Sequence, residues 1–298
     1  MTQIQPGRNK IFFGWWIVGA AFFISLYVGG VVFYGFTTIF EPIAEEFGWT
    51  YLQISLAASI RGLEVGLLAP IAGILADRWG TRKVIFSGGV ITASGLLLLS
   101  QTNSLAMFYG SFVLIAIGIS ASIQTALMTA VAHWFRRRVG LASGIVVSGF
   151  GFGGLLIPIM VKLIDLYGWR TTISILALGA LVIVVPLSFL IRHKPEPYGY
   201  QPDGDFKVTE NYANGESASP VVETGITVKQ ALRGRAFWQL ALAFSCHVMI
   251  TSALMAHIMP YLSTLGVRRS LAGLVATVVP LVSIAGRLSL GWLGDKFN

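Results

Sequence analysis

The sequence predicts an all-α membrane protein, and three observations lead to that fold class. First, 55% of the 298 residues are hydrophobic and only 11% are charged, whereas globular domains carry about 25% charged residues. Second, the apolar residues form runs long enough to cross a bilayer as helices, which takes roughly 20 residues each. Third, the charges stand in short clusters between these runs, where loops are expected.

Each apolar run is expected to form one transmembrane helix. The first run is too long for the apolar core of a signal peptide, so we expect it to be retained. The eight runs lie near residues 12–37, 53–76, 84–101, 105–133, 139–164, 171–192, 236–264 and 270–293.

A short charged turn between the second and third runs, from Gly73 to Lys83, carries the most specific pattern in the chain. The end of the chain repeats this pattern after another apolar run. A turn that recurs in this way indicates a duplicated membrane bundle. The two turns align Gly73 with Gly291, Asp77 with Asp295 and Arg78 with Lys296.

Between the sixth and seventh runs the sequence becomes polar and rich in Pro, Gly and Ser, which is typical of a linker. We therefore expect an N-terminal six-helix bundle over residues 1–192, a cytoplasmic linker over 193–235, and a partial second bundle of two helices over 236–298. The end of the linker, residues 227–233, alternates apolar and basic positions at helical spacing and is expected to lie along the membrane face.

The basic residues fall mostly on one side of the predicted membrane if the N-terminus is cytoplasmic. The positive-inside rule therefore predicts a multi-pass protein of the cell membrane with a cytoplasmic N-terminus. This placement accounts for the net charge of +8 without a nucleic-acid partner. The single cysteine, Cys246, excludes an intramolecular disulfide and a Cys-based metal site, and we expect neither metal nor cofactor.

Two further stretches are interpreted as structural. Glu41, Glu45 and Glu46 follow the first run and are expected to be solvated loop acids. The fifth run is dense in glycine from Gly140 to Gly154, which lets neighbouring backbones approach closely. We expect a helix-packing and hinge surface there rather than a ligand cradle.

Six helices, a linker and a second set with the same charged turn resemble the major facilitator superfamily of secondary transporters. The turn from Gly73 to Lys83 is similar to that family's loop between its second and third helices. Other details resemble its monocarboxylate transporter and oxalate/formate antiporter branch, in the bacterial type. They are Phe13-Gly14-Trp15-Trp16-Ile17-Val18, Trp134-Phe135-Arg136-Arg137-Arg138, Gly140-Leu141-Ala142-Ser143-Gly144, Gly286-Arg287-Leu288-Ser289-Leu290-Gly291, Lys194-Pro195-Glu196-Pro197-Tyr198-Gly199 and Pro202-Asp203-Gly204.

The chain departs from the family's pattern in two respects. The stretch from Tyr34 to Thr38 lacks the lysine of the animal members, and Ser283 stands where they carry an aspartate, so their proton-coupling scheme is not implied. The family has twelve helices, so the resemblance implies a chain truncated after the eighth.

The resemblance implies a secondary transporter of small organic anions such as monocarboxylates, working by alternating access and coupled to a proton or a counter-anion. It implies no enzyme activity. Two alternatives stay open. One is a major facilitator transporter of another cargo, such as a drug or a sugar, because the fold hosts many substrates. The other is a truncated, non-transporting membrane protein that needs a partner.

Arg287 is the foremost candidate for substrate binding. A charge at the bilayer centre costs roughly 2.5–3.5 kcal/mol on insertion scales, so an intramembrane arginine indicates a function. A guanidinium binds a carboxylate through two parallel hydrogen bonds, and the resemblance places the family's substrate-binding arginine at this position. The alternatives are that Arg287 caps helix carbonyls or pairs with Asp295.

Five other residues are candidates for the substrate or proton pathway. Arg61 and Glu64 lie three residues apart on one helix face, either as a neutralised pair or with Glu64 as a proton site. His247 and His257 titrate near physiological pH, and hydrogen-bonded packing is the alternative for both. Tyr34 is a candidate to line a substrate cavity, and contact with the membrane interface or with lipid is the alternative.

Four residues of the two charged turns are expected to form a gate at the cytoplasmic face. An acid there can meet the positive N-terminal dipole of a facing helix and hold the closed state. Topological anchoring by positive charge is a compatible alternative. The predicted gate residues are Asp77, Arg78, Arg82 and Asp295.

Overall fold

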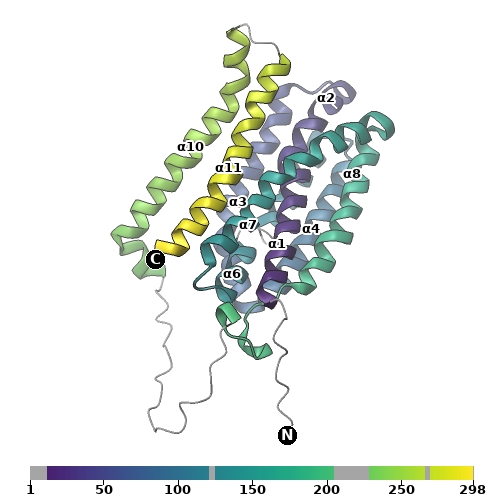
Figure 1. Ribbon diagram of the computed structural model, residues 1–298. Coiled ribbons are helices and arrows are strands. Elements are labelled where there is room, and N and C mark those ends of the chain that lie inside the picture. The colour runs from purple at the N-terminus through teal and green to yellow at the C-terminus, as the bar shows by residue number, and fades with distance from the viewer. Residues whose placement is uncertain (1–11, 121–124, 205–227, 266–268, 298) are drawn as a thin grey trace, which may run out of the picture. The chain divides into compact units, whose positions relative to one another are not determined.

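A computed structural model describes residues 12–120, 125–204, 228–265 and 269–297, except for some side chains within the helices. All regular secondary structure in these residues is helical (Figure 1). The predicted all-helical fold is therefore confirmed for the described part of the chain. The chain divides into two compact units, Met1–Phe206 with Ile284–Asn298, and Lys207–Ser283. The predicted division at residues 192 and 235 stays a prediction.

The first unit begins with one long helical stretch that changes its winding midway. α1 (Phe13–Val28) continues into the π-helical segment η1 (Gly29–Tyr34) and then into α2 (Phe36–Phe47). The Gly35 N–H donates to the Gly30 carbonyl at 2.7 Å, which is the five-residue spacing of a π-helix. Such segments often occur at functional sites.

The helix continues past the predicted end of the first run at residue 37. Glu41, Glu45 and Glu46 therefore lie on α2, and their prediction as loop acids is wrong. The helix ends at Gly48, whose φ of +65° is the left-handed conformation that commonly terminates helices.

The remaining described elements are helical as well. The first unit continues with α3 (Tyr51–Trp79), α4 (Thr81–Ser100), α5 (Leu105–Ile119), α6 (Thr125–Trp134), α7 (Val139–Phe152), η3 (Gly153–Leu156), α8 (Ile157–Leu190), η4 (Glu196–Tyr198) and η5 (Pro202–Gly204). The second unit contains α9 (Val228–Arg233), α10 (Arg235–Thr264) and the first part of α11 (Arg269–Phe297), whose residues from Ile284 onward belong to the first unit.

Local sequence explains several helix boundaries. Thr50 begins α3 with a capping box, in which its hydroxyl accepts the Gln53 N–H at 3.3 Å and the Gln53 side chain accepts the Thr50 N–H at 2.9 Å. A single residue, Gly80, separates α3 from α4, and its φ of +84° favours glycine. Gly168, at φ +76°, interrupts α8 in the predicted gap between residues 164 and 171.

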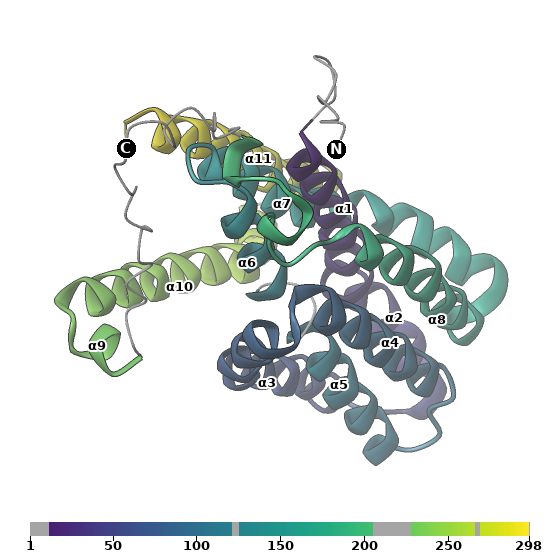
Figure 2. The same cartoon turned by 90° about the horizontal axis from the view of Figure 1, so that it is seen from below.

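The helices of the first unit pack in an order different from their order in the chain. α3 packs on α5, α5 on α4, and α4 on α8. α1 lies between α7 and α8 (Figure 2). Three helical stretches among the described residues, Phe13–Phe47, Thr81–Ser100 and Val139–Leu190, are long and apolar enough to cross a membrane. The full set of eight spans stays a prediction.

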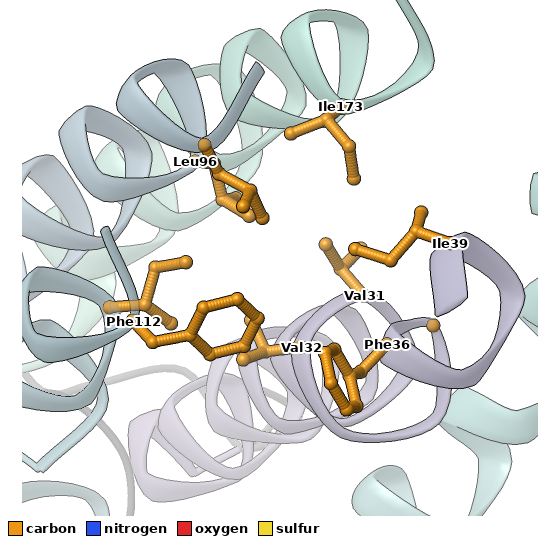
Figure 3. Close-up of a pocket in the computed structure, with 10 residues that line it drawn as sticks. Val31, Val32, Phe36, Ile39, Leu96, Phe112 and Ile173 are labelled. Carbon is orange, nitrogen blue, oxygen red and sulfur yellow. The ribbon is translucent and has the colours of Figure 1, made fainter. Parts of the chain in front are cut away.

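A small cavity lies among η1, α2, α4, α5 and α8. Its volume is about 10 Å³, and apolar side chains including Val31, Phe36, Leu96 and Phe112 surround it (Figure 3). One water molecule needs about 10–15 Å³ and two or more polar partners. The cavity is therefore a dry packing defect and not a ligand site.

A polar clamp joins the end of α2 to the break in α8. Both oxygens of Glu46 take part: one accepts the Trp169 indole N–H at 2.6 Å, and the other forms a salt bridge with Arg170 at 2.8 Å. The Arg170 guanidinium also donates to the carbonyls of Ser100 (3.0 Å) and Thr102 (2.7 Å), between α4 and α5. Glu46 and Arg170 thus tie three segments together.

We expect Glu46→Gln to lower the apparent melting temperature of the protein, whereas Glu45→Gln leaves it unchanged. Glu46 is partly exposed, so the loss is modest, about 1 kcal/mol or less from the ion pair, with a contribution from the hydrogen bond of Trp169. Glu45 is its exposed neighbour on the same helix and is the matched control. Thermal unfolding of the purified protein measures both. Equal shifts for the two variants would contradict the clamp.

Candidate functional site

Arg287 lies half-buried on the part of α11 that belongs to the first unit. Its guanidinium Nη1 donates to the backbone carbonyl of Val147 on α7 at 3.2 Å. Of the two alternatives to substrate binding, the contact with a helix carbonyl is therefore present. Pairing with Asp295 is not, because the Asp295 carboxylate binds the start of α7. No carboxylate among the described residues forms a salt bridge with Arg287.

Tyr34 lies at the end of η1, near Arg287. The ring of Phe150 on α7 lies 5.9 Å from the ring of Tyr34. Next to this point η1 crosses η3 so closely that a Cβ on Gly30 would lie 2.6 Å from the Gly153 carbonyl oxygen. Two irregular helical segments therefore meet beside Arg287, and Tyr34 is the predicted pathway residue that the structure places there.

Asp295, a predicted gate residue, caps α7. Its two carboxylate oxygens accept the backbone N–H groups of Gly140 and Leu141, each at 2.7 Å. Arg138, the N-cap residue of α7, makes no capping hydrogen bond with its own side chain. Two of the first amide groups of α7 therefore bind an acid from α11 beside the positive end of the helix dipole, which is the interaction expected for a gate acid.

Glycines let α7 and α11 touch backbone to backbone. A Cβ on Gly291 would lie 2.5 Å from the Gly140 carbonyl oxygen, and a Cβ on Gly144 would lie 2.9 Å from the Arg287 carbonyl oxygen. No larger side chain fits at either position without moving a helix. The predicted packing role of the glycine-rich run is confirmed at Gly140 and Gly144, and its role as a hinge stays a prediction.

The first part of the linker, residues 191–204, is folded against the end of the first unit where α3, α6 and α8 end. Arg192 lies between the rings of Phe13 (4.1 Å) and Tyr198 (4.0 Å), in a double cation–π contact. Its carbonyl accepts the indole N–H of Trp134 at 3.0 Å, and Tyr200 packs 5.8 Å from the Trp134 ring. The sequence predicted turns in this segment but no packing against α6.

His133 and His193 form an edge-to-face pair in the same region, with ring centres 4.9 Å apart. His133 Nδ1 lies 3.0 Å from the His193 carbonyl oxygen, and His193 Nδ1 accepts the Thr81 N–H at 3.4 Å. Partial burial lowers the pKa of His193, and the neighbouring charges of His133 and Lys194 act in the same direction. A neutral imidazole is what the acceptor role toward Thr81 requires.

The other predicted gate residues surround this region without joining the Asp295 contact. Asp77 and Arg78 are exposed in the last turn of α3. The negative charge of Asp77 partly offsets the lowering of the His193 pKa by burial. The Arg82 guanidinium lies 4.6 Å from the centre of the Phe189 ring on α8. Their assignment to the gate stays a prediction.

The remaining pathway candidates are not brought together by the described residues. His247 is exposed on α10, in the second unit. Arg61 and Glu64 on α3 and His257 on α10 have side chains outside the described part of the structure. Glu46, Arg170 and Asp203 make specific contacts that were not predicted, since each partner is distant in the chain.

The apolar helical bundle defines a multi-pass membrane protein. A family model described as Major Facilitator Superfamily matches residues 11–298. The chain therefore belongs to the Major Facilitator Superfamily, a family of membrane transporters.

Among relatives with curated names, the chain is similar to Monocarboxylate transporter 13 of Bos taurus, with 28% identity over 95% of this chain and 62% of that protein. It is also similar to Monocarboxylate transporter 12 of Rattus norvegicus, with 26% identity over 95% of this chain and 61% of the relative. The chain thus spans about 60% of the length of these relatives.

Among solved structures, the chain resembles the proton:xylose symporter XylE bound to 6-bromo-6-deoxy-D-glucose. The TM-score is 0.65 at 14% identity, over 96% of this chain and 70% of that one. At this identity the likeness supports the fold and not the substrate.

Proposed function

We propose that this protein is a secondary transporter of small organic anions, with monocarboxylates as the substrate class, and that it works by alternating access. The observation that carries the proposal is the position of Arg287: this partly buried residue of α11 reaches α7 with its guanidinium, and its partner there is a neutral carbonyl. The names of the monocarboxylate transporters to which the chain is similar support the substrate class.

A substrate carboxylate is a better partner for Arg287 than the Val147 carbonyl. A carboxylate neutralises the guanidinium and accepts two parallel hydrogen bonds from it, whereas the Val147 carbonyl carries no charge and accepts one. A carboxylate arriving beside α7 would therefore displace the carbonyl. Tyr34, near Arg287 at the end of η1 and next to Phe150 of α7, is proposed to line the same site.

The contact between Asp295 and α7 is proposed to be part of the inner gate. It lies beside the close backbone contact of Gly140 with Gly291, and the transition to the open state would break its two hydrogen bonds. Asp77, Arg78 and Arg82 are assigned to the same gate from the sequence pattern. The transport cycle involves no chemical step, so we propose no enzyme activity.

The proposed location is the cell membrane, with the N-terminus and residues 191–204 in the cytoplasm. Exposed arginines and lysines gather at this end of the first unit, as the positive-inside rule requires. These basic residues include Arg78, Arg82, Lys83, Arg136, Arg137 and Arg138. The proposed topology is a six-helix first bundle followed by two helices of a second bundle.

Uptake of radiolabelled pyruvate tests the substrate class, in proteoliposomes that contain the protein at its natural length. We expect unlabelled pyruvate and other small carboxylates to compete, while glucose and a lipophilic cation do not. Uptake driven by an imposed pH gradient would indicate proton coupling, and uptake that requires a preloaded anion would indicate exchange. Competition by glucose or by the cation alone would favour another cargo.

A further inference from the structure

We propose that Asp203, in the folded linker segment 191–204, is a positioning residue of the inner gate. It holds the turn between α6 and α7 in the conformation in which Asp295 reaches the first amide groups of α7. The inference rests on the proposed gate and adds the linker to it.

Two acids from distant parts of the chain bind neighbouring backbone segments, one the turn between α6 and α7 and the other the start of α7. Asp203 Oδ2 accepts the backbone N–H groups of Arg136 and Arg137 at 2.9 and 2.8 Å. The next amide groups that bind an acid are those of Gly140 and Leu141, which donate to Asp295. Asp203 therefore fixes the backbone directly before the segment on which Asp295 acts.

Asp203 is held in a conformation that its surroundings must impose. Its φ of +62° lies in the left-handed region, and among the residues that the structure describes it is the one non-glycine with a positive φ. Its second oxygen, Oδ1, is buried and has no hydrogen-bond partner within the described segments. An aspartate tolerates both features when its other oxygen makes two charge-assisted hydrogen bonds.

The rest of the segment keeps Asp203 in place. Trp134, at the end of α6, donates to the Arg192 carbonyl, and Tyr200 packs against Trp134 and Phe13. Trp134 thus anchors the chain directly before the turn, and Asp203 anchors the turn itself through Arg136 and Arg137.

The anchoring affects the gate because the α7 cap forms only when two successive amide groups point at one carboxylate. A turn that is already fixed loses little conformational freedom when Asp295 arrives, and preorganisation of this kind strengthens a contact without adding a new one. Without Asp203 the turn can take other conformations. The contact between Asp295 and α7 is then open for a larger share of the time.

Hydrogen–deuterium exchange of the natural-length protein in nanodiscs tests this inference, using overlapping peptides that separate residues 136–137 from 140–141. Asp203→Gly removes the carboxylate and keeps the left-handed backbone, because glycine adopts positive φ without strain. We expect the amides of Gly140 and Leu141, which Asp203 does not touch, to exchange about tenfold faster, as for the loss of one charge-assisted hydrogen bond. Glu196→Gln, an exposed acid of the same segment, is the control and leaves exchange unchanged.

Two further variants make the result decisive. Asp203→Asn keeps an oxygen acceptor and tolerates the left-handed conformation, so we expect partial protection, and it serves in place of the glycine variant if that one does not fold. Asp295→Asn should accelerate the same two amides. Faster exchange at residues 136–137 alone in the Asp203 variants overturns the inference. Unchanged exchange in Asp295→Asn overturns both the proposed gate and this inference. The proposed substrate class is tested separately, by carboxylate uptake, and does not depend on this result.

Discussion

Replacement of Arg287 by lysine is expected to lower carboxylate uptake about 10- to 100-fold, the loss that corresponds to one charge-assisted hydrogen bond. Lysine keeps the charge but is a point donor, so it cannot form the two parallel bonds that a guanidinium makes with a carboxylate. It also loses the planar group that donates to Val147. Initial uptake rates in proteoliposomes measure the effect, normalised to the amount of inserted protein.

Arg138→Lys is the matched control for this substitution. Arg138 is exposed at the start of α7, and its side chain makes no capping hydrogen bond. We expect uptake close to that of the unmodified protein. If Arg287→Lys also transports normally, Arg287 is not the anion site, and another residue must bind the carboxylate.

Replacement of Gly291 by alanine is expected to reduce uptake by about tenfold or more, although alanine is the better helix former. The added Cβ would lie 2.5 Å from the Gly140 carbonyl oxygen, which belongs to a helix backbone and cannot rotate away. α11 must then move away from α7, which weakens both hydrogen bonds of Asp295. Each is charge-assisted and contributes about 1.5–3 kcal/mol.

Gly294→Ala provides the comparison within the same helix. A Cβ at Gly294 has no neighbour within 4 Å, so the substitution changes helix propensity alone. We expect normal uptake and an unchanged or higher melting temperature. If Gly291→Ala behaves in the same way, the backbone contact between α7 and α11 does not matter for transport.

The helical class of the fold could be predicted because it depends on composition and on the length of apolar runs. The details that depend on packing could not. The first run was expected to end at residue 37, yet the helix continues to Phe47, where Glu46 meets Trp169 and Arg170. Amphipathic periodicity also does not reveal the one extra residue that turns Gly29–Tyr34 into a π-helix.

For the candidate site, individual residues could be predicted from the sequence more readily than the partners that they contact. The repeated turn identified Asp295, and helix-dipole reasoning predicted its kind of partner, but the distance in sequence hid that the partner is α7. Asp203 was predicted only as part of a turn, since nothing in Pro202-Asp203-Gly204 shows that it reaches Arg136 and Arg137. Arg61, Glu64 and His257 have side chains outside the described residues, so their roles stay predictions.

The small size of the cavity beside η1 bears on how the first unit can move. A space of about 10 Å³ gives the surrounding side chains no room to change rotamers together. A closely packed group of helices moves as a rigid body, so displacement occurs at its contacts with neighbouring helices, where one helix can slide along another. The glycine contacts of α7 with α11 form such an interface. Conformational change in this protein should therefore alter the position of whole helices and leave the interior around Phe36 and Phe112 almost unchanged.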